Sequence, residues 1–336
     1  MLNKIYEQIL KIVKNNYVFF IGLLIGFALM TIKLPYYINA PGGVSDISEK
    51  LEIKGYTIKP DSFNLAYVYE FRATLPSFLY SYINQNWELI PKEKIVLPNE
   101  NRKEVKFRDQ MMLKESLQNA IIVGYKKAGI DVLIKDPKLL ITYIDENSKT
   151  NLKIGDEILS INNIKTKNLN DIKTISKSFN LDDLLEVEVK RDGEILKREA
   201  KVFREDDRLI IGIIISVDQE IETDPEFISK FDEADSGPSG GLMMSLTIYD
   251  TLTGSNLSKD KKIVGTGTID IDGNVGEIGG IKYKIKGAIK DKMDIFFVPF
   301  GKNYEEIIEE QEENNYNITI VPVKTIDDAI NYLKNL

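Results

Sequence analysis

Residues 235–250 read DSGPSGGLMMSLTIYD, a turn-forming run that gives way to an apolar stretch with helical spacing. A Gly/Pro turn before such a stretch predicts the start of a helix. Ser239 stands at this boundary, where serine is also a favoured capping residue. Taken alone, the stretch predicts an ordinary helix start. A nucleophilic serine becomes the better interpretation only if a base for its proton lies nearby.

The chain has 336 residues and contains neither histidine nor cysteine. These absences exclude Ser-His-Asp triads, cysteine nucleophiles and Cys/His zinc sites. The sequence shows no metal-ligand cluster of fixed spacing, and we expect neither a metal nor a cofactor. A serine nucleophile here would need lysine as its base, and lysine can serve when burial lowers its pKa to about 7–8.

A lysine-rich segment downstream, IKYKIKGAIKDK at 281–292, predicts a helix with an apolar stripe along one side. At 100° per residue, Lys286 and Lys290 point to solvent. Lys284 lies beside the stripe, nearer its centre than Lys282. Lys284 is therefore the candidate base.

Strands and helices alternate from residue 205 to the C-terminus, which predicts an α/β (α+β) domain over 205–336. The expected strands are 209–217, 261–270, 294–300 and 318–323, and the expected helices are 241–252, 281–292, 303–315 and 326–336.

The N-terminal region predicts a membrane anchor. Residues 1–16 carry three lysines, and residues 17–34 hold no charge before Lys33, a length of ~27 Å as a helix. The positive-inside rule places 1–16 in the cytoplasm and the remaining chain outside the cell. A cleaved signal peptide is the alternative, but Ile38 is too bulky for the −3 position before a cut after Ala40. We also expect a turn at 41–43, PGG.

The middle of the chain predicts two regions. Residues 38–125 contain strand-like runs and a helix at 108–129, and we expect this region to pack on the C-terminal domain. Residues 126–203 include LKIGDEILSINN at 152–163, which resembles a PDZ domain. That resemblance implies that an extended peptide binds by adding to a sheet edge. The segment near 129–134 lacks a GLGF-like loop. The alternative that this region is a spacer domain that binds no ligand therefore stays open.

The C-terminal motifs carry a second resemblance. GPSGG at 237–241, GTGTIDIDGNVGEIGGIKYKIKGA at 265–288 and IFFVP at 295–299 resemble the proteolytic domain of the Lon family of Ser-Lys proteases. With the N-terminal span, PYYINAPGG at 35–43 and the PDZ-like region, the order is similar to that of membrane-anchored PDZ-Lon proteases of Gram-positive bacteria.

This second resemblance implies the roles of several residues. Ser239 would be the nucleophile, Lys284 the base, and Thr266 would lie near the amine. Gly237 and Gly240 would let the backbone approach the substrate, and we expect the Ser239 amide to donate to the oxyanion. Lon proteins often have an acidic residue three positions before the serine, where this chain has a serine, so no carboxylate is assigned to the dyad.

The expected function is ATP-independent cleavage of extracytoplasmic peptides or unfolded secreted proteins, because no GxxxxGK[ST] loop is present. An inactive, membrane-tethered PDZ scaffold is the alternative, and processing of a single signal peptide is a third interpretation. The net charge of −8 argues against nucleic acid as a partner. The sequence does not decide whether the chain forms a homo-oligomer.

Overall fold

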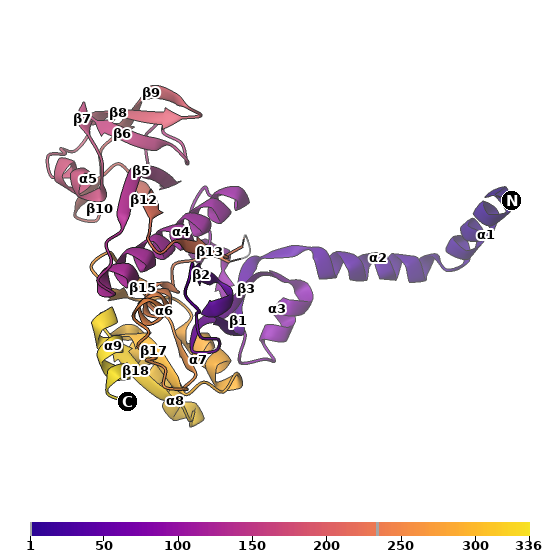
Figure 1. Cartoon of the computed structure of the whole chain (residues 1–336). Coiled ribbons are helices and arrows are strands. Elements are labelled where there is room, and N and C mark those ends of the chain that lie inside the picture. The colour runs from indigo at the N-terminus through magenta and orange to yellow at the C-terminus, as the bar shows by residue number, and fades with distance from the viewer. Residues whose placement is uncertain (1, 233–234) are drawn as a thin grey trace. The chain divides into compact units, whose positions relative to one another are not determined.

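The computed structural model describes residues 2–232 and 235–336, which divide into two units (Figure 1). Unit 1 comprises the chain up to Pro41 together with Val68–Ile95, and unit 2 comprises Gly42–Tyr67 and Val96–Leu336. Strands β1 (Lys33–Asp46) and β3 (Phe63–Thr74) each begin in one unit and end in the other.

Unit 1 opens with helices α1 (Leu2–Asn15) and α2 (Tyr17–Thr31). Among the described residues, no single helix is long and apolar enough to cross a membrane, although α1 and α2 qualify together as a pair bent by 80°. The expected helix over 17–34 is too long at its C-terminal end, because α2 stops at Thr31 and Lys33 begins β1. Pro35 gives the reason, since the residue before a proline avoids the helical conformation.

The rest of unit 1 is small. The first half of β1 pairs antiparallel with β4 (Glu88–Pro91). Helix α3 (Leu75–Ser81) begins with a capping box formed by Thr74 and Ser77, and a short 3-10 turn, η2 (Lys92–Lys94), follows β4.

Unit 2 contains a parallel sheet of four strands in the order β18-β17-β14-β3, with β1 beside β3. The sheet is covered on both faces, because successive residues of one strand enter different cores: Phe297 packs with α6 and α9, and Phe296 packs with α7 and α8. The bounds are β14 (Ile263–Gly265), β17 (Ile295–Pro299), β18 (Thr319–Val323), α6 (Gly241–Thr253), α7 (Ile281–Lys290), α8 (Lys302–Asn314) and α9 (Ile326–Lys334).

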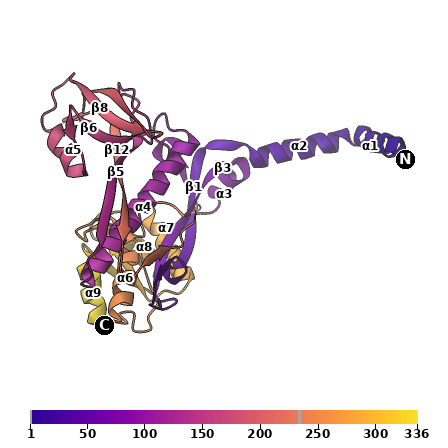
Figure 2. The ribbon, with the colours of Figure 1, turned by 45° about the horizontal axis from the view of Figure 1, so that its top comes forward.

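Residues far upstream of 205 complete this layer. Strand β3 hydrogen-bonds to β14, and β2 (Leu51–Ile53), which follows the turn η1 (Ile47–Glu49), pairs with β13 (Phe227–Ser229). Helix α4 (Arg102–Lys127) packs against α6, and both views of the ribbon place the two helices side by side (Figures 1 and 2). The hairpin β15 (Thr268–Ile269) and β16 (Val275–Gly276) lies beside α4 and α6.

The turn expected at 41–43 is absent, because these residues lie within β1. A Cβ on Gly42 would come within 2.3 Å of the Tyr67 carbonyl oxygen. Glycine is needed there because β1 and its neighbour approach closely, and no chain reversal occurs.

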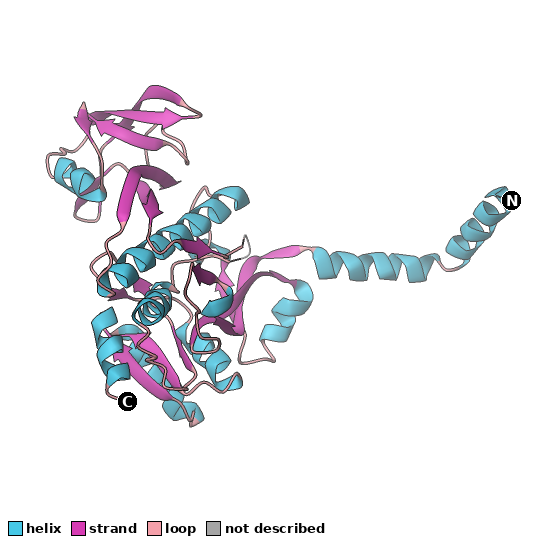
Figure 3. Cartoon of the chain, in the orientation of Figure 1, coloured by secondary structure: helices cyan, strands magenta, loops and turns pink. Residues whose placement is uncertain are grey.

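The second sheet of unit 2 has the order β12-β5-β6-β8-β9, with β7 paired to β6. Strands are magenta in Figure 3. It has its own apolar core, to which α5 contributes. The bounds are β5 (Leu133–Ile144), β6 (Glu157–Ile161), β7 (Ile164–Lys165), α5 (Leu169–Ser176), β8 (Leu184–Arg191), β9 (Glu194–Lys201), β10 (Phe203–Glu205), β11 (Arg208–Ile210) and β12 (Ile213–Glu222).

This sheet extends past the expected boundary at 203–205, because its strand β12 spans Ile213–Glu222. The run 209–217, expected as a core strand of the C-terminal domain, is interrupted at Gly212, and β12 pairs with β5 instead. A continuous apolar run predicts a buried strand without indicating which sheet receives it. At the end of β12, Ile221 already packs against the core of the parallel sheet, and β13 follows.

Candidate active site

Ser239 lies in the turn that leads into α6, and the helix itself begins two residues later, at Gly241. Gly237 has a φ of 83°, a conformation that glycine adopts without steric cost. A Cβ on Gly240 would approach Leu65 Cδ2 to 3.0 Å. The two glycines therefore permit the sharp entry to α6 and the close packing behind it.

Helix α7, on the opposite face of the sheet, brings Lys284 to the same serine. Its apolar stripe packs on the sheet, and Lys284 is only 3% exposed. The Lys284 Nζ donates to Ser239 Oγ at 2.8 Å. Lys286, expected in solvent, is instead half-buried and pairs with Glu310 at 3.0 Å, whereas Lys290 is exposed.

The electrostatics of Lys284 are set by burial alone. Burial lowers the pKa of Lys284 from 10.5 to about 7, and no charged group of the described residues contributes to this shift. A substantial fraction of the amine is therefore neutral near pH 7. In that state it has a lone pair that can accept the serine proton.

Thr266 orients this amine. It follows β14, is fully buried, and its Oγ1 accepts from Lys284 Nζ at 2.9 Å while donating to the Ser239 carbonyl oxygen at 3.1 Å. Because the hydroxyl proton is committed to Ser239 O, the lone pairs of Thr266 Oγ1 face the amine. One N–H of neutral Lys284 is thereby engaged, and its lone pair is left for Ser239 Oγ.

The backbone N–H of Ser239 has no hydrogen-bond acceptor among the residues that the structure describes, and neither has that of Gly240. Both lie at the N-terminal end of α6, where the helix dipole favours negative charge. These two amides could stabilise an oxyanion that forms beside Ser239 Oγ.

Asp235 points to a different partner. Its carboxylate pairs with Lys50 Nζ at 2.8 Å and accepts from the Asp232 N–H at 2.9 Å. The carboxyl group is therefore occupied by these two partners and makes no described contact with Lys284. Within the described ranges, no group of three or more Asp, Glu, His or Cys side chains is placed to hold a metal ion.

A loop missed by the sequence reasoning lies at the edge of the second sheet. Strand β12 is its edge strand and begins after Gly212, whose φ is 70°. The N–H groups of Ile211 and Gly212 have no acceptor within the described part of the chain. Its sequence signal is the apolar-Gly-apolar run at 209–215, which also has the composition of a buried core strand.

Residues 228–335 match the family described as the Lon protease (S16) C-terminal proteolytic domain. The Lon protease of Aster yellows witches'-broom phytoplasma is 24% identical over 308 residues, which cover 88% of this chain and 37% of that protein. The Lon protease of Brucella suis biovar 1 is 23% identical over 319 residues, covering 88% and 36% respectively. That of Trichlorobacter lovleyi is 33% identical over 94 residues, covering 28% and 11%.

The matches therefore cover less than two fifths of the length of these curated relatives. The chain is a mixed α/β protein with a Lon-type proteolytic domain, of a serine peptidase family, at its C-terminal end and a β-rich region before it. The match starts at residue 228, within β13.

Proposed function

We propose that the chain is an ATP-independent, membrane-anchored endopeptidase in which Ser239 is the nucleophile and Lys284 the base. One observation carries the proposal: a buried lysine of pKa about 7 lies 2.8 Å from the hydroxyl of a serine at a helix N-terminus. The match to a proteolytic domain supports peptidase chemistry at this site.

In the first step, neutral Lys284 takes the Ser239 hydroxyl proton as Oγ attacks the peptide carbonyl carbon. The negative charge that develops on the carbonyl oxygen is met by the free amide at Ser239. Collapse of this intermediate breaks the C–N bond, and Lys284 returns its proton to the leaving amine. Water then attacks the acyl-enzyme with Lys284 again as base, which releases the acid and restores the serine.

The proposed substrates are extended peptides and unfolded chains. The sequence has no GxxxxGK[ST] loop to couple ATP to unfolding. Strand β12 is the edge strand of its sheet, and the Ile211 and Gly212 amides, which have no acceptor among the described residues, lie where that edge begins, so a peptide could add there. Further along β12, the Gln219 carbonyl already accepts from Gln118 Nε2 of α4 at 2.6 Å. A PDZ-like role in holding substrate is therefore part of the proposal.

The membrane placement draws support from unit 1. Helix α2 contains no charged residue and buries none of its side chains. Residues 73–87 are also uncharged, yet Leu79, Tyr82 and Ile83 are 56%, 72% and 80% exposed. Aromatic and aliphatic side chains of this kind favour a membrane interface. In this topology the lysines of α1 are cytoplasmic and the catalytic domain is outside the cell.

The fluorescence of the single tryptophan, Trp87, can test that placement, because Trp87 ends the uncharged stretch 73–87. The centroid of its ring lies 4.9 Å from that of Tyr80. In the full chain reconstituted into vesicles, we expect lipids brominated near the headgroup to quench its fluorescence. Tyr82→Asp should weaken the quenching, whereas Ile195→Asp, at an exposed position of β9, should not. Equal fluorescence in brominated and ordinary lipid would contradict the membrane placement.

Three variants of the full chain test the chemistry, with fluorescein-labelled casein as the unfolded reporter. Ser239→Ala and Lys284→Met should each abolish cleavage, because the first removes the attacking hydroxyl and the second removes the amine that accepts its proton. Lys290→Met, on the exposed side of the same helix, should cleave like the parent. The alternative, an inactive peptide-binding scaffold, predicts that neither Ser239→Ala nor Lys284→Met differs from the parent. Cleavage of one extracellular peptide at one bond, with casein ignored, would indicate a processing enzyme.

A further inference from the structure

Helix α4 contacts the serine turn through a buried hydroxyl. Ser116 Oγ donates to the Pro238 carbonyl oxygen at 2.8 Å, and Ser116 is 4% exposed. The two residues are 122 positions apart in sequence, and Ser116 lies outside the matched region 228–335. A Cβ on Gly241 would come within 2.9 Å of Ser116 Oγ, so glycine at 241 leaves room for the hydroxyl.

The contact fixes the orientation of the peptide unit between Pro238 and Ser239. The Pro238 carbonyl and the Ser239 N–H belong to the same trans peptide unit, so they point in opposite directions. A hydroxyl that holds the carbonyl towards α4 therefore holds the N–H away from α4. It also polarises the amide, which strengthens its N–H as a donor.

Neighbouring peptide groups are held in the same way. The Ser239 carbonyl oxygen accepts from Gly267 N at 2.8 Å, and the Gly237 N–H donates to the Asp109 carbonyl oxygen at 3.3 Å. The peptide units 236–237, 238–239 and 239–240 thus each have a hydrogen-bonded carbonyl or amide. The N–H of Ser239 is left free in the middle of this set.

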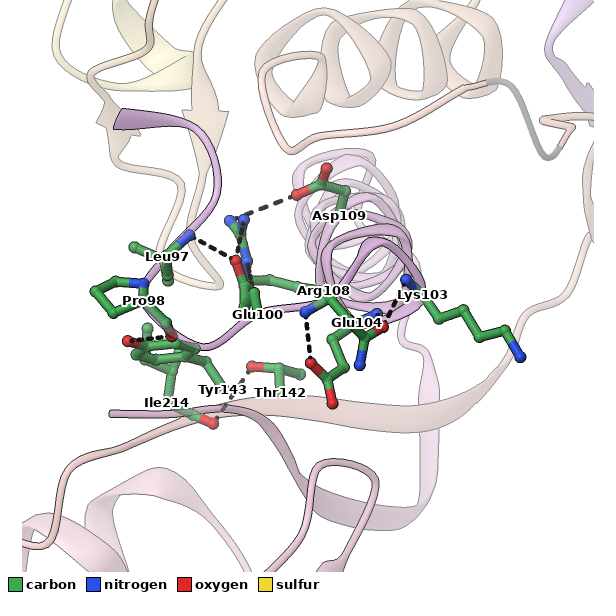
Figure 4. A network of polar contacts seen from close by, with 11 residues as sticks. Leu97, Pro98, Glu100, Lys103, Glu104, Arg108, Asp109, Thr142, Tyr143 and Ile214 are labelled. Carbon is green, nitrogen blue, oxygen red and sulfur yellow. Dashed lines mark hydrogen bonds and ion pairs between the residues drawn. The ribbon is translucent and has the colours of Figure 1, made fainter. Parts of the chain in front are cut away.

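The support for Ser116 is rigid. At the start of α4, Glu100 accepts from Arg108 Nε at 2.7 Å and from Leu97 N at 2.8 Å, with its side chain 1% exposed (Figure 4). Further along, a Cβ on Gly124 would come within 2.6 Å of the Ile248 side chain on α6. Because α4 is braced at its start and packed tightly on α6, the position of the Ser116 hydroxyl is fixed.

From these contacts we infer that Ser116 is a positioning residue, which aims the Ser239 N–H at the oxygen of the substrate carbonyl. The inference rests on the proposed peptidase function. An interaction that strengthens as charge develops on that oxygen lowers the barrier to the chemical step and leaves substrate binding unchanged.

Four versions of the full chain test the inference with fluorescein-labelled casein: the parent, Ser116→Ala, Ser116→Cys and Ser245→Ala. Ser245 is the matched control, since it is a buried serine of α6 whose hydroxyl donates to the Gly241 carbonyl at 2.8 Å. We expect Ser116→Ala to lower kcat about tenfold at unchanged KM. Ser116→Cys, which keeps a weaker donor, should fall between, and Ser245→Ala should stay within about twofold of the parent.

The pH profile separates positioning from damage to the dyad. Burial sets the pKa of Lys284 near 7, so the midpoint of kcat/KM against pH should be the same in Ser116→Ala and in the parent. An unchanged kcat, a loss confined to KM, a shifted midpoint or an equal loss in Ser245→Ala would each overturn the inference. If the parent cleaves no faster than Ser239→Ala, the proposed function fails and the inference with it. If the parent cleaves and Ser116→Ala matches it, the inference alone fails.

Discussion

Replacing Lys284 with methionine should stabilise the protein at low pH while abolishing cleavage. The fall in the pKa of Lys284 from 10.5 to about 7 corresponds to about 5 kcal/mol against the charged amine in the folded state. Methionine has a similar length and carries no charge, so it removes this cost. It also leaves the hydroxyls of Ser239 and Thr266 without the amine, at a cost of ~1–2 kcal/mol. We expect a net gain of ~3 kcal/mol at pH 6.

The gain should depend on pH in one direction. Below pH 7 both the folded and the unfolded parent hold the Lys284 proton, so the folded state carries the full cost of the buried charge. Between pH 7 and 10.5 the unfolded chain keeps a proton that the folded protein has released, so the stability of the parent rises with pH. The advantage of Lys284→Met should therefore shrink across this window and reverse near its upper end.

Urea titration with hydrogen-exchange mass spectrometry of peptides from α7 measures the effect where the lysine lies, and avoids treating a chain of several parts as two-state. Lys290→Met, on the exposed side of α7, is the control and should follow the parent at every pH. If Lys284→Met is less stable than the parent at pH 6, or if the difference does not change between pH 6 and 10, Lys284 is not a neutral buried base and the reasoning is refuted.

Four further outcomes are expected. In the parent, kcat/KM should rise with pH through a midpoint of about 7, as neutral Lys284 forms; a midpoint above 9 in the pH–rate profile would contradict the burial argument. Thr266→Val should lower kcat about tenfold in the casein assay, because the amine loses the acceptor that orients it; parental kcat would show that orientation is unnecessary. Asp235→Asn should leave the midpoint of kcat/KM against pH unchanged, since the partner of Asp235 is Lys50; a shifted midpoint would indicate that the Asp235 carboxylate acts on Lys284. Gly124→Ala should destabilise the protein by ~2 kcal/mol in thermal unfolding through overpacking against α6, and unchanged stability would show that α4 can move aside.

The sequence was sufficient to predict the local elements around the site. The helices at 241–252 and 281–292 were expected close to where α6 and α7 form, because their apolar spacing is strongly periodic. The same periodicity indicated that Lys284 is the inward lysine. Because the chain contains no histidine, its composition alone indicates lysine as the base for a serine nucleophile.

What the sequence could not predict depends on contacts between distant segments. The run at 209–217 has the composition of a buried strand, and only its pairing with β5 shows which sheet contains it. The PGG at 41–43 has turn composition, but its glycines serve the close approach of Tyr67. Ser116 gave no signal, because a serine within a helix has the same local pattern whether its hydroxyl is exposed or bound to a loop 122 residues away.

The region that matches the proteolytic family does not contain the whole site. Its strand β14 lies between β17 and β3, and β3 comes from residues 63–74, so without the upstream chain one edge of the central strand would be unpaired and Val264 would lose part of its core. The turn that presents Ser239 is likewise bound from outside, through the Asp109 carbonyl and the Ser116 hydroxyl of α4. The proposed nucleophile and its proposed base lie within the matched region, but the strand and helix that fix their geometry precede it by more than a hundred residues. Changes in residues 96–127 should therefore alter the rate of the chemical step as directly as changes beside Ser239.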